Sequence, residues 1–256
     1  MRGFFGTRSQ AQAAIRAGEV LVEGQVVDKP GALIPLEAKI ELLAQPRYVS
    51  RGGLKLEHAL RVFNISVEGK TAVDIGASTG GFTDCLLQHG ARRVYAVDVG
   101  YGQLDWRLRQ DERVIVLERL NARYLKPEDL GEQVDLATID VSFISLKLIL
   151  PPLQVVVKPA GELIALIKPQ FEAGREQVRK GVVRDLAVHE RVLHELAQFA
   201  AEEGFTLRGA TYSPLRGLEG NIEFFFYLQN LPGKGEEVDF AALVAEAWET
   251  LAPDES

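Results

Sequence analysis

The chain has 256 residues, of which 46% are hydrophobic and 25% charged, as is typical of a folded globular protein and not of a disordered or fibrous one. It has no apolar stretch near the ~20 residues of a membrane-spanning helix, no visible signal peptide and a single cysteine, so we expect a cytoplasmic protein without membrane attachment or internal disulfides. Its net charge of −7 argues against a protein that coats nucleic acid over its whole surface.

The first 44 residues predict a small α+β domain. Its expected elements are one helix and three short strands, at residues 9–17, 20–22, 26–27 and 38–42. The first 18 residues contain three arginines and no acidic side chain, which favours a local site for a polyanion, although a chance scatter of charges explains the count equally well. Residues 45–50 have the composition of a linker.

Residues 51–256 predict a larger domain in which strands and helices alternate. The expected strands are residues 72–75, 93–98, 114–117, 134–139, 162–167, 206–212 and 222–228. The expected helices are residues 53–63, a helix through Leu86 and Leu87, residues 146–157, residues 188–203 and a last helix from Asp239. This alternation predicts a Rossmann-like α/β fold, with a mostly parallel sheet, an antiparallel last strand and helices on both faces.

A glycine-rich turn after the first of these strands predicts a cofactor site. It lies between a strand and a helix, and Asp98 ends the next strand, where a carboxylate can accept hydrogen bonds from both ribose hydroxyls. The alternative is a tight structural turn with an incidental acid. The residues expected to bind the cofactor are Asp74, Gly76, Ala77, Ser78, Thr79, Gly80, Gly81, Phe82, Asp98, Val99 and Asn121.

The spacing of the glycines favours S-adenosylmethionine over a dinucleotide. The dinucleotide fingerprint needs a glycine at position 78, where the backbone approaches a pyrophosphate, and this chain has Ser78. S-adenosylmethionine has no phosphate, and Asp74 is placed to face its ammonium group.

Four charged residues are expected to meet at one edge of the sheet. Asp140 and Lys168 end two strands, and Pro169 holds Lys168 extended. Glu223 opens the last strand, and Lys55 lies on the polar face of the first helix of this domain. Each residue alone is more typical of a surface ion pair than of a site, but two strand ends among the four favour a site.

Six segments occur in the order found in the TlyA family, the hemolysin-A-like ribosomal RNA 2′-O-methyltransferases, and the chain resembles that family. The segments are YVSRGGLKL (48–56), DIGASTGGFTD (74–84), AVDVG (96–100), DVSFISL (140–146), KPQFE (168–172) and EGNIE (219–223). The resemblance implies an S4-type RNA-binding domain followed by an FtsJ-like methyltransferase domain. It also implies that Lys55, Asp140, Lys168 and Glu223 form the catalytic tetrad of that domain.

The N-terminal resemblance to an S4 domain covers residues 7–11 and 15–24. An S4 domain normally begins with a helix that this sequence is expected to lack. The resemblance implies ribosomal RNA or a ribosomal subunit as the partner, and the expected RNA contacts are Arg8, Ser9, Arg16, Arg47 and Arg51.

A ribose 2′-hydroxyl must lose its proton as it attacks the methyl group, and we expect Lys168 to be the base. Asp140 would orient Lys168, and Lys55 and Glu223 would complete the network, with no metal ion required. Alternative functions are an NAD-dependent oxidoreductase, a base-modifying methyltransferase, a haemolysin and a non-catalytic ribosome-binding factor. Asp140 is followed by Val141-Ser142-Phe143 and not by the two prolines usual in methyltransferases that act on exocyclic amines.

Overall fold

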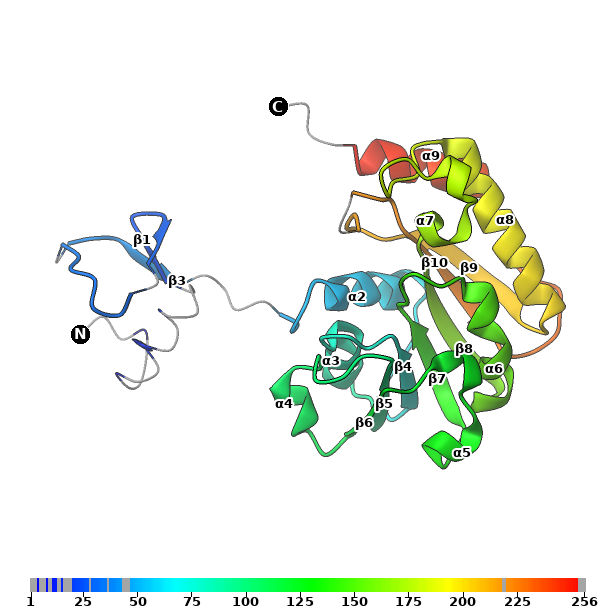
Figure 1. Ribbon diagram of the computed structural model, residues 1–256, viewed down its shortest axis with the longest axis horizontal. Coiled ribbons are helices and arrows are strands. Elements are labelled where there is room, and N and C mark those ends of the chain that lie inside the picture. The colour runs from blue at the N-terminus through cyan, green and yellow to red at the C-terminus, as the bar shows by residue number, and fades with distance from the viewer. Residues whose placement is uncertain are drawn as a thin grey trace. The chain divides into compact units, whose positions relative to one another are not determined.

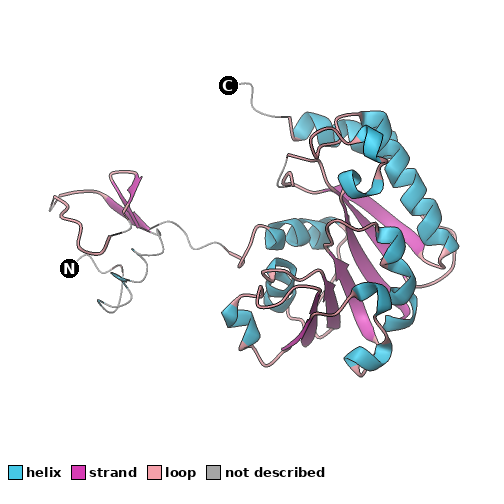
Figure 2. Ribbon diagram, in the orientation of Figure 1, coloured by secondary structure: helices cyan, strands magenta, loops and turns pink. Residues whose placement is uncertain are grey.

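The computed structural model describes residues 4, 8, 11–12, 15, 20–27, 29–35, 37–42, 47–217 and 220–252. The chain divides into two compact units, Met1–Arg47 and Tyr48–Ser256, which are considered separately below. Figure 1 shows the chain from its N-terminus to its C-terminus, and Figure 2 shows the distribution of helices and strands.

The first unit contains a small antiparallel sheet. Its strands are β1 (Val20–Val22), β2 (Gln25–Val26) and β3 (Ile40–Leu42), in the order β2-β1-β3. Glu23 and Gly24 join β1 to β2 with positive φ angles of 52° and 77°, as a two-residue hairpin turn requires. Within the predicted helix of this unit, Ala11, Gln12 and Ile15 are helical. Ser9 and Arg16 lie outside the described residues.

The second unit is built on a seven-stranded sheet with the order β6-β5-β4-β7-β8-β10-β9. Its strands are β4 (Thr71–Ile75), β5 (Arg93–Asp98), β6 (Val114–Glu118), β7 (Val134–Ile139), β8 (Val157–Ile167), β9 (Thr206–Tyr212) and β10 (Phe224–Gln229). The ladders from β6 to β8 are parallel, and β10 runs antiparallel to both β8 and β9. The prediction of a mostly parallel sheet with an antiparallel last strand is confirmed.

Helices cover both faces of this sheet (Figure 1). They are α2 (Gly52–Val62), α3 (Gly81–Gln88), α4 (Trp106–Arg109), α5 (Pro127–Leu130), α6 (Leu150–Val156), α7 (Pro169–Glu172), α8 (Leu186–Glu202) and α9 (Phe240–Thr250). Alternate strand residues enter two separate cores: Val73 and Ile75 pack with α6, α8 and α9, whereas Ala72 packs with α2 and α3. This alternation is the period of two that a strand imposes on its side chains. Among the described residues, none of the helices is long and apolar enough to cross a membrane.

Several predicted boundaries differ from the structure, and three of them affect the segments around β8 and β10. Residues 146–157 do not form one helix: a 3₁₀ turn, Leu146–Leu148, precedes α6 (Leu150–Val156), because the prolines at 151 and 152 are tolerated only in a first helical turn. Strand β8 begins at Val157 and not at residue 162. Strand β10 begins at Phe224, so Glu223 precedes the last strand and does not lie in it.

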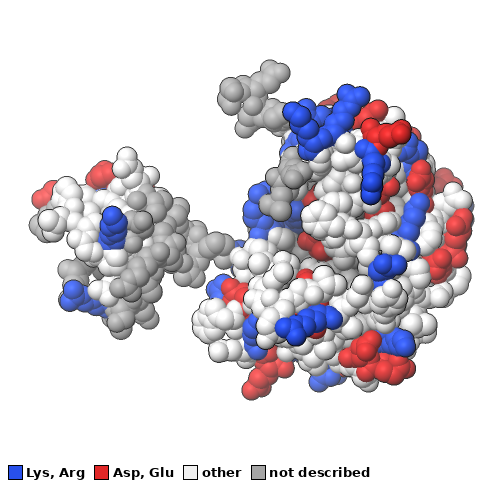
Figure 3. All heavy atoms as spheres, viewed as in Figure 1, with Lys and Arg blue, Asp and Glu red and all other residues white. Residues whose placement is uncertain are grey.

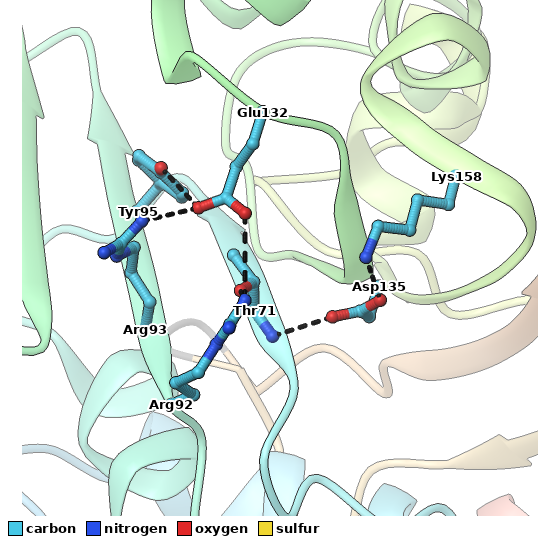
Figure 4. Close-up of polar contacts among 7 residues, drawn as sticks. All are labelled: Thr71, Arg92, Arg93, Tyr95, Glu132, Asp135 and Lys158. Carbon is cyan, nitrogen blue, oxygen red and sulfur yellow. Dashed lines mark hydrogen bonds and ion pairs between the residues drawn. The ribbon is translucent and has the colours of Figure 1, made fainter.

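Charged side chains at the edge of the sheet where its parallel strands begin are paired with one another or with polar groups (Figure 4). Glu132 accepts hydrogen bonds from Arg93 (2.6 Å) and from the hydroxyl of Tyr95 (3.0 Å). Asp135 accepts from the backbone N–H of Thr71 (2.9 Å) and from Lys158 (2.6 Å). The charges drawn at this edge are therefore paired, and the opposite edge carries the groups described next.

Candidate active site

The turn between β4 and α3 requires glycine at two positions. Gly76 has a φ of +84°, and a Cβ there would overlap the carbonyl oxygen of Asp140. Gly80 has a φ of +96° and precedes the first residue of α3. A side chain at either position would therefore strain the backbone, and at Gly76 it would separate β4 from the segment that follows β7.

Ser78 stands in this turn where a dinucleotide-binding sequence has glycine. It is exposed and adopts a left-handed φ of 48°. Its backbone N–H donates to Asp98 Oδ2 (2.8 Å), and Gly100 N–H donates to Asp98 Oδ1 (2.7 Å). The turn and the end of β5 are thereby held together, and the remaining lone pairs of Asp98 can accept from hydroxyl groups.

Asp74, an expected cofactor contact, is completely buried beneath the turn. Its carboxylate accepts hydrogen bonds from Thr83 of α3 (2.7 Å) and Thr138 of β7 (3.1 Å). Burial raises the pKa of Asp74 to about 7 against the effect of these hydrogen bonds. The side chain thus connects β4, α3 and β7.

The other expected cofactor residues differ in exposure. Thr79, Val99 and Asn121 are exposed, and Asn121 Oδ1 also caps the 3₁₀ turn Ala122–Tyr124. Ala77 and Phe82 are buried, as is Gly81 at the start of α3, and the Phe82 ring lies 6.3 Å from that of Phe225 in the core.

The four predicted charged residues form two ion pairs. Lys55 Nζ lies 2.5 Å from Glu223 Oε2, and Lys168 Nζ lies 2.6 Å from Asp140 Oδ1. The Glu223 side chain is only 3% exposed and that of Asp140 24% exposed. The sequence prediction that these residues meet therefore agrees with the geometry, while their catalytic roles remain predictions.

The sheet topology explains why the two pairs are neighbours. Lys168 directly follows β8 in an extended conformation (φ −110°, ψ 97°), as expected before Pro169. Because β10 runs antiparallel to β8 and Phe224 pairs with Ile167, the residue before Phe224 lies beside the residue after Ile167. Glu223 and Lys168 are therefore brought to the same edge from opposite chain directions.

Among the influences on the Glu223 carboxyl, burial is the largest. It raises the pKa of Glu223, whereas the positive charges of Lys55 and Lys168 act in the opposite direction and the negative charge of Asp140 adds to the increase. Two cations and two anions balance, which is the condition under which buried charges are tolerated. Within the described part of the chain, no group of three His, Cys, Asp or Glu side chains could hold a metal ion.

The sequence did not predict two residues that lie at this edge, Ser142 and Phe143. Ser142 Oγ accepts a hydrogen bond from Lys168 Nζ (2.8 Å). Phe143 is 90% exposed, has a left-handed φ of 63° and lies 5.0 Å from the Phe171 ring. Both follow Asp140 in a loop, where no hydrophobic period marks a residue. For Phe143 the indication is its exposed ring on a strained backbone, and both features become visible only in the structure.

The expected RNA contacts fall partly within the described residues. Arg8, Arg47 and Arg51 are exposed. Arg51 directly precedes α2, one helical turn before Lys55.

Two family models match the chain. The FtsJ-like methyltransferase model matches residues 48–230, and the S4 domain model matches residues 1–40. The first match contains the glycine-rich turn and both ion pairs.

Known proteins resemble the chain over most of its length. The 16S/23S rRNA (cytidine-2′-O)-methyltransferase TlyA of Mycobacterium tuberculosis is 45% identical over 89% of this chain and 86% of that protein. YqxC of Bacillus subtilis, provisionally named an rRNA methyltransferase, is 51% identical over 98% of this chain and 92% of that protein.

A solved structure from Streptococcus thermophilus, provisionally named a hemolysin, is 49% identical and has a TM-score of 0.80. The match covers 97% of this chain and 93% of that one.

The chain belongs to the TlyA (hemolysin A) family, in which an S4 domain precedes an FtsJ-like methyltransferase unit, here residues 48–256.

Proposed function

We propose that the protein transfers a methyl group from S-adenosylmethionine to the 2′-hydroxyl of a ribose in ribosomal RNA. One observation carries the proposal: the glycine-rich turn with Asp98 and the ion pairs Lys55–Glu223 and Lys168–Asp140 occupy the same edge of one sheet. The M. tuberculosis relative, named for 2′-O-methylation of rRNA, supports the same chemistry.

The residues of the turn fit S-adenosylmethionine. A ligand in an open α/β sheet binds beyond the carboxyl ends of the strands, at the point where the strand order reverses, and here that point lies between β4 and β7. Asp98 would accept the ribose hydroxyls of the cofactor, and Gly76 lets the turn pass close to Asp140. Bound there, S-adenosylmethionine supplies a methyl group on a positively charged sulfur.

Lys168 is the best-placed base. It directly follows β8 and has two oxygen partners, Asp140 and Ser142. As an unprotonated amine, Lys168 would take the proton from the 2′-hydroxyl while that oxygen becomes the nucleophile. Asp140 and Ser142 would hold its Nζ in one position, since orientation of a catalytic group accounts for much of a rate enhancement.

Lys55 and Glu223 would complete the site as a second, more buried pair. Glu223 is buried at this edge, and its pKa is affected by the charges of Lys168 and Asp140 as well as by that of Lys55, which supports a single site. We infer that the charges of this pair set the electrostatic potential around Lys168 and Asp140. We also infer that Lys55 contacts the ribose.

The substrate proposal rests on both units. The S4 match supports binding to structured RNA through exposed arginines such as Arg8. Phosphate contacts of this kind give affinity without reading the base, so the S4 unit would dock the protein on a ribosomal subunit. The reaction would then take place in the cytoplasm.

Ribosomal RNA from cells with and without the gene tests the proposal. After digestion to nucleosides, mass spectrometry should find one ribose-methylated nucleoside that is lost with the gene and restored by a plasmid copy. If the lost nucleoside carried its methyl group on the base, the site would serve a different methyltransferase chemistry. Identical nucleosides in the two strains would remove rRNA as the substrate.

A further inference from the structure

The segment between α7 and α8, residues 173–185, is unusually basic. It contains four exposed cations, Arg175, Arg179, Lys180 and Arg184, and none has an ion pair within the described part of the chain. Its acidic residues are Glu176 and Asp185, and Asp185 caps α8 through its side chain. Unpaired positive charge is concentrated here although the whole chain has a net charge of −7.

A tight hairpin at residues 179–182 presents two of these cations. Arg179 and Val182 exchange backbone hydrogen bonds of 3.0 Å in each direction. Lys180 and Gly181 form the turn with positive φ angles of 51° and 79°, a conformation that favours Asn-Gly or Gly-Gly. Lysine at the first position therefore places a long cationic side chain at the apex despite an unfavourable backbone angle.

Asn221 fixes this basic hairpin to the candidate active site. Its side chain is buried, accepts from Val183 N–H (3.0 Å) and donates to the carbonyl of Gly181 (2.8 Å). Asn221 precedes Glu223 by two residues, and the basic segment itself begins directly after α7, whose first turn follows Lys168. The hairpin is thus hydrogen-bonded to the segment that carries Glu223, and the chain before it leads back through α7 to Lys168.

We infer that the basic hairpin is an arm of the methyltransferase unit that binds the phosphate backbone of the RNA beside the reacting ribose. The inference rests on the proposed function and deepens it. A polynucleotide whose ribose lies at Lys168 continues on both sides with phosphates, and cations without acidic partners gain most from such contacts. Because Asn221 holds the arm in place, binding costs little ordering entropy.

The surface supports an anionic partner. Figure 3 shows several Lys and Arg side chains, with Asp and Glu side chains beside them, over the part of the methyltransferase unit where α7 and α9 lie. The four cations come from a stretch of ten residues, and the hairpin tip is too short and polar to offer an apolar surface to a folded protein.

The test compares two doubly substituted proteins with equal charge loss. The arm variant is Arg179→Gln with Lys180→Gln, and the control is Lys126→Gln with Lys234→Gln. Both control lysines are exposed and lie toward the opposite edge of the sheet, since Lys126 precedes α5 just before β7 begins and Lys234 follows the end of β10. Methylation of ribosomal RNA is measured as a function of RNA and salt concentration, and S-adenosylmethionine binding is measured by calorimetry.

The arm variant should raise KM for RNA about tenfold, as expected for lost charged contacts, and lower the salt slope of binding by about 1.5 for two phosphates. Its kcat at saturating RNA and its S-adenosylmethionine affinity should equal those of the wild type. An unchanged KM and slope, an equal effect in the control, or a loss confined to kcat would overturn the inference while leaving the proposed function intact. Wild-type protein that does not methylate RNA would overturn both.

Discussion

At the scale of single residues, each of the four clustered charges has an opposite partner. Lys55 is paired with Glu223 and Lys168 with Asp140, and three of the four side chains are less than 15% exposed. Removing one member of a buried pair leaves the other without compensation, which typically costs about 3–5 kcal/mol. Catalytic loss in such variants must therefore be measured beside stability and cofactor affinity.

Lys168→Ala should lower the single-turnover rate of methyl transfer about a hundredfold or more, because general-base catalysis contributes ~10²–10⁴ in rate. Asp140→Ala should lower this rate by a comparable factor, because a lysine amine that is not held in position is a poor base. S-adenosylmethionine affinity, measured by calorimetry, should stay near the wild-type value in Lys168→Ala.

Lys168→Arg is the matched control for this prediction. It keeps the positive charge beside Asp140 but does not deprotonate near neutral pH. The rate should therefore stay as low as in Lys168→Ala. A rate near that of the wild type would make Lys168 an electrostatic residue and leave the proton to water.

Asp98→Ala should weaken S-adenosylmethionine binding by about 1–3 kcal/mol, because it removes an acceptor from the turn and from the proposed ribose contact. Asp98 accepts from Ser78 N–H and Gly100 N–H, so the turn itself should also loosen. Glu118→Ala is the control, since Glu118 ends the neighbouring strand β6 and accepts from Gly102 N–H (2.9 Å). Calorimetry that finds equal losses in the two variants would remove Asp98 from the cofactor site.

At the scale of elements, the strands of the sheet could be predicted and the loops at its edge could not. Residues 163–167 of β8 are all apolar and all buried, and such a continuous apolar run marks a strand that is covered on both faces. Helices α4, α5 and α7 have four residues each and are too short to show a helical period. Ser142 and Asn221 act through tertiary hydrogen bonds, and such contacts leave no local pattern in a single sequence.

The packing of α9 on α8 predicts a pH dependence of stability. Trp248 Nε1 donates to Nδ1 of the buried His189 (3.4 Å), and burial lowers the pKa of His189 to about 4. Because the folded pKa lies below the usual 6.5, the stabilisation is complete above pH 6.5 and is lost as the pH falls toward 4.

The expected size of this effect is on the order of 3 kcal/mol, at 1.36 kcal/mol for each unit of pKa. The melting temperature of wild-type protein should fall between pH 6.5 and pH 4, and His189→Phe should show a clearly smaller fall over the same window. Parallel curves for the two proteins would mean that other groups cause the acid sensitivity.

At the scale of the whole molecule, we expect the S4 domain to bind the RNA and the methyltransferase unit to bind the cofactor and carry out methyl transfer. A protein that begins after Gln45 keeps Tyr48, which is buried in the methyltransferase unit and packs against Gly53. It should bind S-adenosylmethionine as the full chain does but lose affinity for ribosomal RNA and most of its salt dependence. Filter binding with ribosomal RNA over a salt series checks this, and undiminished affinity would contradict an RNA-docking role for the S4 domain.

The most direct test of ribose methylation uses purified wild-type and Lys168→Ala protein, S-adenosylmethionine with an isotopically labelled methyl group, and ribosomal RNA from a strain without the gene. After digestion, mass spectrometry of the nucleosides locates the label on the sugar or on the base. We predict label on a ribose 2′-oxygen with the wild type and at least about a hundredfold less with Lys168→Ala at early times. Label on a base, or equal labelling by the two proteins, would contradict the account.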